Sequence, residues 1–261
     1  MKRIYMMKFS MVLVSAGLLF CVGLAAAMKY NQQQGKIKPA VQQGRKDTYD
    51  AALLARLNRL VGSLDLNNTC AYRAVVSMTS PTDSMSAIRN VPVVFCREGQ
   101  RCYYRYGPEE MINEGGFNVL ISHEQKKVII DRQKPVNAPV TGNLQDFAKG
   151  MASEHYALQS EAGAEEETIL LKNEKHLTCR EFAITYRKAD EKVTRLFARL
   201  PDSYDPLDKG KDRRVTMQIT AWTKSPDWEA YPHLDRVIRI ADGKIELTKK
   251  YMDYELINIL K

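Results

Sequence analysis

Residues 90–107 read NVPVVFCREGQRCYYRYG and contain two β-rich segments separated by a glycine. Segments 91–96 and 101–106 are rich in valine, phenylalanine and tyrosine, which favour pleated strands. Gly99 lies between them, and a glycine at this point is typical of a tight hairpin turn. This stretch therefore predicts an antiparallel hairpin, and it indicates a fold in which strands pair with their neighbours along the chain.

Two cysteines flank this turn, and their relation depends on the length of the loop. If Glu98-Gly99-Gln100 forms a three-residue loop, Cys96 lies directly across from Cys102, and a cross-strand disulfide is within reach. If Glu98-Gly99 forms a two-residue turn, Phe95 faces Cys102 and the thiols point to opposite faces. Besides Cys21, an even number of cysteines follows the N-terminal segment, as is typical of an oxidising compartment: Cys70, Cys96, Cys102 and Cys179. The Cys96–Cys102 disulfide is one prediction, and packed free thiols are the alternative.

The alternation of apolar and polar residues continues along the chain and predicts about ten antiparallel strands. Besides the hairpin, the expected strands are 70–78, 117–122, 127–131, 168–171, 178–186, 194–199, 215–222, 236–240 and 244–250. Asp242-Gly243 indicates a hairpin turn between the last two. We also expect a helical turn within 108–114 and a short capped helix at 143–151.

Residues 47–64 predict the one long helix. Asp47 can cap its N-terminus, with Asp50 in the first turn. An apolar stripe then recurs at helical spacing, through Leu53, Leu57, Leu60 and Leu64. Such a stripe has to be buried, and a curved sheet offers its concave face. We therefore expect an α+β fold, mostly antiparallel β: a curved sheet or open β-barrel with the N-terminal helix packed on its concave face.

Residues 9–28, FSMVLVSAGLLFCVGLAAAM, form an uncharged apolar run long enough to cross a bilayer as a helix. The basic residues before it and Ala25-Ala26-Ala27 at its end equally fit a signal peptide. The sequence thus divides into a signal peptide or membrane anchor at 1–28, a flexible linker at 29–46 and a single β-rich envelope domain at 47–261. We expect the bulk of the chain to be exported, periplasmic or anchored to the membrane.

The formal charge of +8 comes from the N-terminal region. Eight of the 39 basic residues precede Asp47, which is the first acidic residue, so the remaining 31 balance the 31 acidic residues. A nucleic-acid-binding surface requires clustered basic charge. A nucleic-acid partner is therefore not expected.

The sequence lacks the motifs of the common catalytic and cofactor sites. It contains no GxSxG, no HExxH, no phosphate-binding glycine loop and no dinucleotide fingerprint. His176 and Cys179 lie close together, but structural zinc requires four such ligands. We expect no catalytic residue, no metal and no cofactor.

The order of these elements resembles the LolA/LolB-type envelope proteins, which carry lipoproteins or lipids on an open β-barrel. The resemblance covers residues 47–251 and rests on the exported start, the N-terminal helix, hairpins such as MINEGGFNVLISHEQKKVII (111–130), the mid-chain helix and the terminal DRVIRIADGKIELTKKY. It rests on element order and periodicity rather than on a diagnostic motif. It implies an apolar ligand between helix and sheet and no catalysis.

The resulting hypothesis is a non-catalytic envelope protein whose β-rich domain binds an apolar ligand or a lipidated partner. Residues on the expected apolar faces are the candidates for lining the site: Leu53, Leu57, Leu60, Tyr72, Val94, Tyr104 and Tyr106. The alternative is a membrane-anchored structural subunit of an envelope or secretion complex, whose partners would be other envelope proteins.

Overall fold

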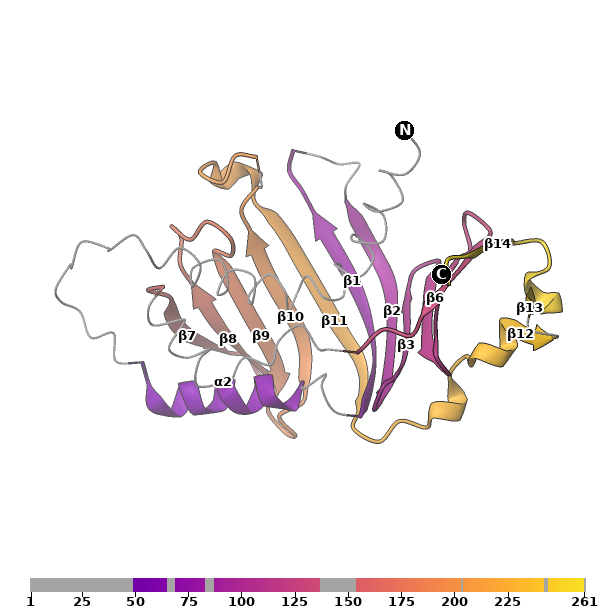
Figure 1. Cartoon of the computed structure of the whole chain (residues 1–261). Helices are drawn as coiled ribbons and strands as arrows, with labels where there is room; N and C mark the ends of the chain where they lie inside the picture. Colours follow the sequence, from indigo (N-terminus) through magenta and orange to yellow (C-terminus); the bar gives the residue numbers. More distant parts are fainter. Residues whose placement is uncertain are drawn as a thin grey trace, which may run out of the picture. The chain divides into compact units, whose positions relative to one another are not determined.

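The computed structural model describes residues 49–64, 69–82, 87–136, 154–202, 204–241 and 244–260 (Figure 1). The expected leader, linker, helix at 143–151 and Asp242-Gly243 turn lie outside the described residues. The strands are β1 (Cys70–Thr79), β2 (Ile88–Glu98), β3 (Arg101–Tyr106), β4 (Glu109–Glu114), β5 (Phe117–Ser122), β6 (Lys127–Arg132), β7 (Ala157–Ala162), β8 (Glu166–Lys172), β9 (Glu181–Arg187), β10 (Val193–Leu200), β11 (Arg213–Thr223), β12 (Ile238–Ala241), β13 (Lys244–Leu247) and β14 (Glu255–Asn258). The helices are α2 (Ala51–Ser63) and the 3-10 turns η2 (Lys209–Lys211), η3 (Trp228–Ala230), η4 (Leu234–Arg236) and η5 (Lys249–Tyr251).

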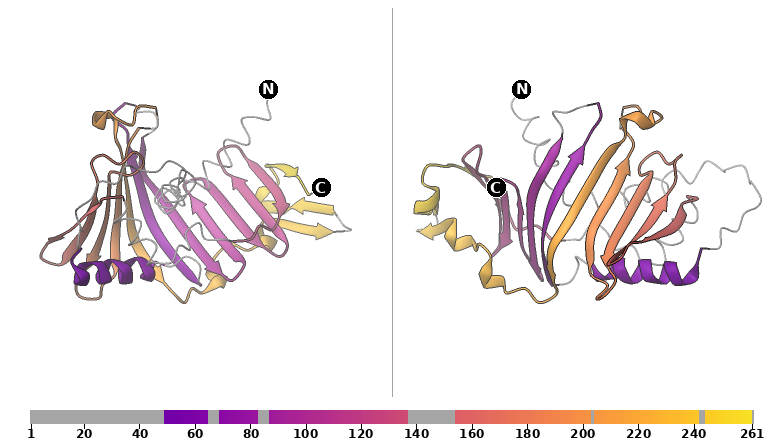
Figure 2. Two further views of the ribbon diagram at one scale, coloured as in Figure 1. Left: turned by 60° about the vertical axis from the view of Figure 1, so that its left-hand side comes forward. Right: turned by 180° about the vertical axis from the view of Figure 1, so that it is seen from behind.

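Twelve strands belong to one sheet, in the order β14-β6-β5-β4-β3-β2-β1-β11-β10-β9-β8-β7, while β12 and β13 form a separate hairpin. Successive strands pair antiparallel along β2 to β6 and along β7 to β11, whereas β14 runs parallel to β6. Figure 2 shows these strands from two further directions. The order ends at β14 and β7, which do not pair with each other, so the described sheet is not closed. This confirms the predicted α+β class with a mostly antiparallel, open sheet.

The chain folds into two compact units. The first contains the described residues among 1–65, 76–90 and 139–219, which include α2 and β7 to β10. The second contains those among 66–75, 91–138 and 220–261, which include β3 to β6 and the C-terminal segment.

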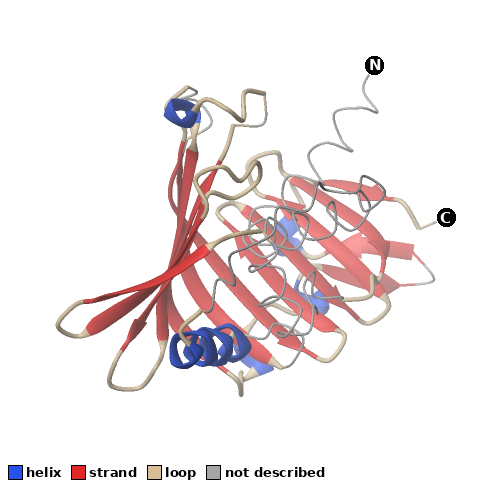
Figure 3. Ribbon diagram, turned by 90° about the vertical axis from the view of Figure 1, so that its left-hand side faces the viewer, coloured by secondary structure: helices blue, strands red, loops and turns tan. Residues whose placement is uncertain are grey.

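In the first unit, α2 packs on one face of β8 and β9. Its N-cap is Asp50, whose carboxylate accepts hydrogen bonds from the backbone N–H groups of Ala52 and Leu53. The helix therefore begins at Ala51, and the expected cap Asp47 lies outside the described residues. Leu57 and Leu60 are fully buried. Figure 3 shows the helix against the strands.

The side of the sheet that α2 covers follows from its polar contacts. Arg56 Nη1 lies 3.1 Å from Glu167 Oε2 and donates to the Tyr186 hydroxyl at 3.0 Å. Glu167 and Tyr186 are opposite each other, and Ile169 and Ile184 are the next opposed pair on the same face. Because side chains alternate along a strand, the helix covers the face that carries these buried isoleucines.

A buried ionic network joins two loops of the first unit. Arg180, which precedes β9, pairs with Asp212, which precedes β11, and both are almost fully buried. Arg180 also donates to the carbonyl of Pro206, while Arg199 on β10 contacts Asp212 and Glu174. The network therefore fixes the loop 173–180 against the loop 201–212.

In the second unit, the C-terminal segment packs on one face of β2 to β6. One row of that face runs through opposed residues of successive strands: Cys96, Tyr103, Ile112, Val119 and Ile130. These side chains form a core together with Trp228, Val237, Ile238 and Tyr251 from the C-terminal segment. The segment then adds β14 to the edge of β6, with Glu255 N–H donating to the Lys126 carbonyl at 2.8 Å.

The expected helical turn within 108–114 is wrong, because this segment is strand β4. Gly107 and Gly115 have φ of 56° and 59°, a left-handed conformation that glycine adopts without strain. Each lies in a short turn, so β4 follows β3 and precedes β5 directly and pairs with both. Strands β7 and β14 are further elements that the alternation does not predict.

The register of the β2–β3 hairpin contradicts the predicted Cys96–Cys102 disulfide. Glu98 is opposite Arg101, so Gly99 and Gln100 form a two-residue turn, and Gly99 has a φ of 60°. Cys96 is then opposite Tyr103, and Cys102 is opposite Arg97 rather than the Phe95 expected for a two-residue turn at Glu98-Gly99. This register directs the two thiols to different faces of the sheet. Both are buried free thiols. Burial raises the pKa of each to about 12.

We expect the Cys96 and Cys102 thiols to be unreactive in the folded chain. Thiolates are the reactive form, and burial keeps both groups protonated at neutral pH. A chromogenic disulfide reagent should therefore titrate them only after denaturation. Addition of a reductant should leave the urea midpoint of the folded chain unchanged. A midpoint that falls on reduction would show that a disulfide is present.

Substitution Glu174→Gln tests the edge of the ionic network. The hydrogen bond from Arg199 is the main cause that lowers the pKa of Glu174 to about 2, with Lys172 and Lys209 adding to it. Because the folded pKa is depressed, this contribution to stability is present above the unfolded pKa of about 4.3 and is lost as the pH falls towards 2. The Glu174 side chain is 36% exposed, so solvent limits the effect to about 1 kcal/mol at most.

The measurement is the urea midpoint of wild type and variant over this pH range. At neutral pH the Glu174→Gln chain should be the less stable of the two, and the difference should vanish in acid. Glu161→Gln, on the exposed strand β7, is the matched control. A difference that stays constant with pH would contradict the assignment.

Candidate functional site

The second face of β1 to β6, opposite the C-terminal core, carries a continuous row of apolar side chains. Phe95, Tyr104, Met111, Leu120 and Ile129 are successive cross-strand neighbours from β2 to β6. The rings of Tyr72 and Phe95 stack at 5.2 Å, and those of Tyr72 and Trp222 stack at 5.6 Å. We call this set the transverse row: Trp222, Tyr72, Phe95, Tyr104, Met111, Leu120 and Ile129.

The transverse row is long and only partly covered. It crosses seven strands, β11 and β1 to β6, and strands in a sheet lie about 4.8 Å apart, so its length is about 29 Å. Tyr72 is buried, whereas the other six members are of intermediate exposure. This distinguishes the row from the opposite face, where Cys96, Tyr103, Ile112, Val119 and Ile130 are all buried. An apolar surface of this length that retains exposure is typical of a binding surface.

A polar row borders the transverse row on one side. Its members are cross-strand neighbours of one another: Arg97, Cys102, Asn113, Asn118 and Asp131. The Asn113 amide donates to the carbonyls of Gln100 and Lys134, and the Asn118 amide donates to Asn113 Oδ1 at 3.1 Å. These amides are thus used within the fold, so this row limits the width of the apolar strip.

The row on the other side contains a buried carboxyl group. It comprises Val93, Tyr106, Glu109, Ser122 and Lys127. The Ser122 hydroxyl donates to Glu109 Oε1 at 2.7 Å. Burial raises the pKa of Glu109, and the hydrogen bond from Ser122 opposes that rise. The carboxyl group therefore sits in a poorly hydrated environment beside the apolar strip.

Two hydrogen-bond donors at this face have no acceptor. Within the described part of the chain, the Tyr106 hydroxyl and Trp222 Nε1 are buried atoms without a hydrogen-bond partner. A buried donor without an acceptor costs about 1–3 kcal/mol, so native proteins usually supply one. An oxygen of a bound molecule would satisfy either group. The face thus combines a long apolar strip with a few polar atoms, as ligand-binding surfaces commonly do.

The residues expected to line the site are distributed over different places. Tyr72 and Tyr104 belong to the transverse row, and Tyr106 lies in the next row on the same face. Val94 points to the opposite face and packs against the C-terminal core, so it does not lie with them. The helix residues belong to the first unit, where Leu57 and Leu60 are buried and Leu53 is half-buried: Leu53, Leu57 and Leu60.

Five members of the row were not among the expected residues: Trp222, Phe95, Met111, Leu120 and Ile129. Alternation alone could not assign Phe95 to this face, because β2 is apolar on both sides around Val93, Val94 and Phe95. Met111 follows from β4 only once that segment is recognised as a strand. Assigning Trp222 to the row requires the contact with Tyr72, which the order of residues does not reveal.

The polar clusters of the second unit are engaged in packing. His123 Nε2 lies 3.0 Å from Glu110 Oε1, and its Nδ1 lies 2.9 Å from the Tyr254 hydroxyl. The Tyr103 hydroxyl donates to the other oxygen of Glu110 at 3.2 Å. This chain of contacts attaches the C-terminal segment to β3 and β4. No group of three or more His, Cys, Asp or Glu side chains in the described ranges is placed to hold a metal ion.

None of the described helices has the length and apolar content needed to cross a bilayer.

Comparison with known proteins identifies similar structures but no family. No family model matches the chain, and no curated protein matches it. Among solved structures, lipoprotein LppX of Mycobacterium tuberculosis is 11% identical, with 68% of this chain and 98% of that chain covered and a TM-score of 0.39. A LolA superfamily protein from Nitrosomonas europaea is 8% identical, with 69% and 94% covered and a TM-score of 0.28.

A third similar structure is a putative outer membrane lipoprotein-sorting protein domain from Vibrio parahaemolyticus. It is 6% identical, with 65% of this chain and 91% of that chain covered and a TM-score of 0.25. Of these three structures, the Nitrosomonas europaea protein carries the name of the LolA superfamily.

Proposed function

We propose that this chain is a non-catalytic protein of the cell envelope that binds a long apolar ligand, or the acyl chain of a lipidated partner, along the transverse row. The observation that carries the proposal is the row of seven aligned apolar side chains on one face of the second unit, six of which are partly exposed. The opposite face of the same strands is already covered by the C-terminal segment.

The dimensions of the row suit an acyl chain. The hydrocarbon core of a bilayer is about 30 Å thick and is spanned by two acyl chains end to end, so one chain extends about 15 Å. The transverse row, at about 29 Å, is long enough for one chain with room to spare or for two in line. Its side chains are aromatic or flexible, and methionine in particular adapts to ligands of variable shape.

The two donors without an acceptor favour a ligand that carries oxygen atoms. The Tyr106 hydroxyl and Trp222 Nε1 are at the face that bears the row and can each donate to an ester, carboxylate or phosphate oxygen. Lipids and acylated polypeptides combine such oxygens with apolar chains. The residues that would bind the ligand are therefore Tyr72, Tyr104 and Met111 for its chain, with Tyr106 and Trp222 as polar contacts.

The expected compartment follows from the N-terminal sequence. Residues 9–28 form an uncharged apolar run that fits a signal peptide or a membrane anchor, and the polar segment 29–46 separates it from the folded part. Either form would deliver the β-rich part to the envelope, where lipids and lipidated proteins are its neighbours.

Titration with a fluorescent polyene fatty acid tests the proposal on the full chain. The wild type should bind the probe saturably. The double variant Met111→Gln with Leu120→Gln keeps side chains of similar size but removes apolar contact at the middle of the row. We expect it to weaken binding about tenfold, from the loss of roughly 0.7 kcal/mol at each partly exposed position.

The matched control changes two exposed apolar residues outside the row, Met252→Gln with Ile240→Gln. It leaves the N-terminal apolar run intact, so it also reports any probe that binds there. Equal affinity of the row variant and the control would contradict the proposal, as would the absence of saturable binding in the wild type. In the latter case, an anchored structural subunit of an envelope complex is the remaining hypothesis.

A further inference from the structure

Three large apolar side chains protrude from two neighbouring loops of the first unit. Leu177 lies in the loop between β8 and β9 and is 58% exposed. Tyr204 and Leu207 lie in the loop between β10 and β11 and are 97% and 79% exposed. We call these three residues the apolar tip. Among the described residues six large apolar side chains are exposed, and three of them lie on these two loops.

The exposure of the apolar tip is imposed by the rigid support beneath it. The almost fully buried pair Arg180–Asp212 and the bond from Arg180 to the Pro206 carbonyl join the two loops. The Asp202 carboxylate accepts from the backbone N–H groups of Tyr204 and Asp205, at 2.8 Å and 3.1 Å. With the backbone held on both sides, Tyr204 and Leu207 cannot fold back without breaking these contacts.

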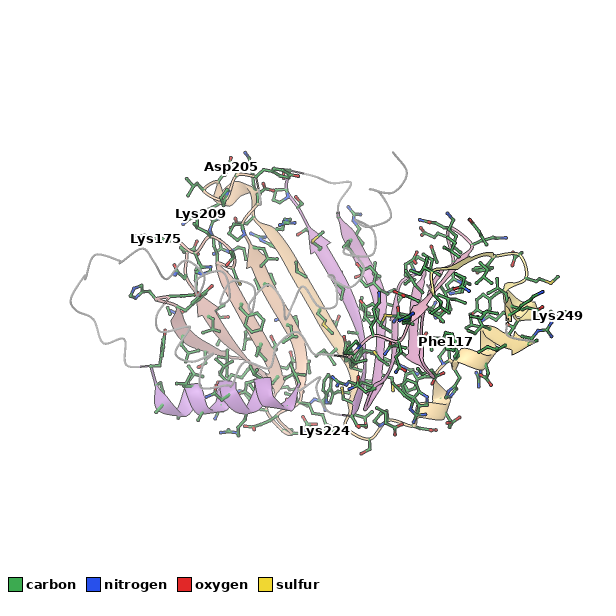
Figure 4. All side chains as sticks on the ribbon, in the orientation of Figure 1. Phe117, Lys175, Asp205, Lys209, Lys224 and Lys249 are labelled. Carbon is green, nitrogen blue, oxygen red and sulfur yellow. The ribbon has the colours of Figure 1, made fainter. Side chains whose placement is uncertain are left out.

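Charged side chains of both signs contact one another around the tip. Lys209 lies 3.2 Å from Glu174, and Lys211 lies 2.7 Å from Asp205. Figure 4 shows Lys175, Asp205 and Lys209 together at this end of the first unit. Lys172 adds a further contact to Glu174 at 3.2 Å. The tip therefore presents apolar side chains in a ring of balanced charge rather than a basic patch.

The form of the tip fits a lipid surface better than a protein partner. Stable protein interfaces bury about 1,200–2,000 Å² around a packed apolar centre, whereas these three side chains are separated along the chain by charged residues. A bilayer accepts individual protruding side chains. Tyrosine favours the headgroup region, leucine the hydrocarbon, and neighbouring lysines extend towards water.

We infer that the apolar tip is a membrane-contact surface, with Leu207 and Leu177 entering the hydrocarbon and Tyr204 lying at the headgroup level. The apolar run at 9–28 supports a lipid bilayer as the occupant, because as signal or anchor it brings this chain to a membrane. Since the local charges are balanced, the contact is apolar and requires no anionic lipid. The inference does not depend on ligand binding at the transverse row.

The test places a fluorescent reporter at the tip of the full chain. A Tyr204→Trp chain reconstituted into phosphatidylcholine vesicles should be quenched by brominated phosphatidylcholine beyond the level of the wild type, whose Trp222 and Trp228 provide the background. Leu207→Ser in the same chain should lower the ratio of inserted to free tip about tenfold, as expected for one leucine side chain. Quenching should persist in concentrated salt.

Met252→Trp is the matched control, because Met252 is another exposed apolar residue, 75% exposed and outside the tip. The inference is overturned if the Tyr204→Trp chain is quenched no more than the Met252→Trp chain. It is also overturned if the quenching disappears in concentrated salt. The fatty-acid titration uses variants of the transverse row, so its result is independent of the tip. If the tip is not quenched by brominated lipid but the chain binds the fatty-acid probe, the membrane contact alone is refuted. If the tip is quenched but the probe does not bind, the proposed ligand site alone is refuted.

Discussion

The register of the β2–β3 hairpin determines what each face of the second unit can do. With Cys96 opposite Tyr103, one alternate set of side chains faces the C-terminal segment and forms a core. The other set, through Phe95 and Tyr104, forms the transverse row. A shift of one residue would exchange the two sets, because side chains alternate strictly between faces. The two-residue turn at Gly99 and Gln100 is the local feature that excludes this shift, since it requires the left-handed conformation that Gly99 provides.

Alternation predicted most of the sheet, because most strands bury one face. It failed where polar residues are buried and where a strand has no apolar face. Strand β4 begins with Glu109 and Glu110, which read as a surface segment, yet both are buried. Their partners Ser122 and Tyr103 come from other strands and His123 from the β5–β6 turn, so the compensation is visible only in three dimensions. Strand β7 is polar and exposed and has no apolar face to reveal it.

The candidate site was predicted only in part, for a related reason. Tyr72, Tyr104 and Tyr106 share a face, as their expected strands imply, but Val94 does not. Strand β2 is apolar on both sides around Val93, Val94 and Phe95, so composition alone does not tell which of them faces the core. The pairing of β2 with β3 decides which residue faces the core. That pairing depends on the length of the β2–β3 turn, which the sequence alone did not determine. The free thiols follow from the same turn.

Strand β14 has a consequence for how the second unit is completed. It is the last described strand, and it pairs with β6, which lies far earlier in the chain. A polypeptide is made from its N-terminus, so β6 is synthesised with an open hydrogen-bonding edge and keeps it until β14 follows. During that interval the edge is a template for pairing with other chains.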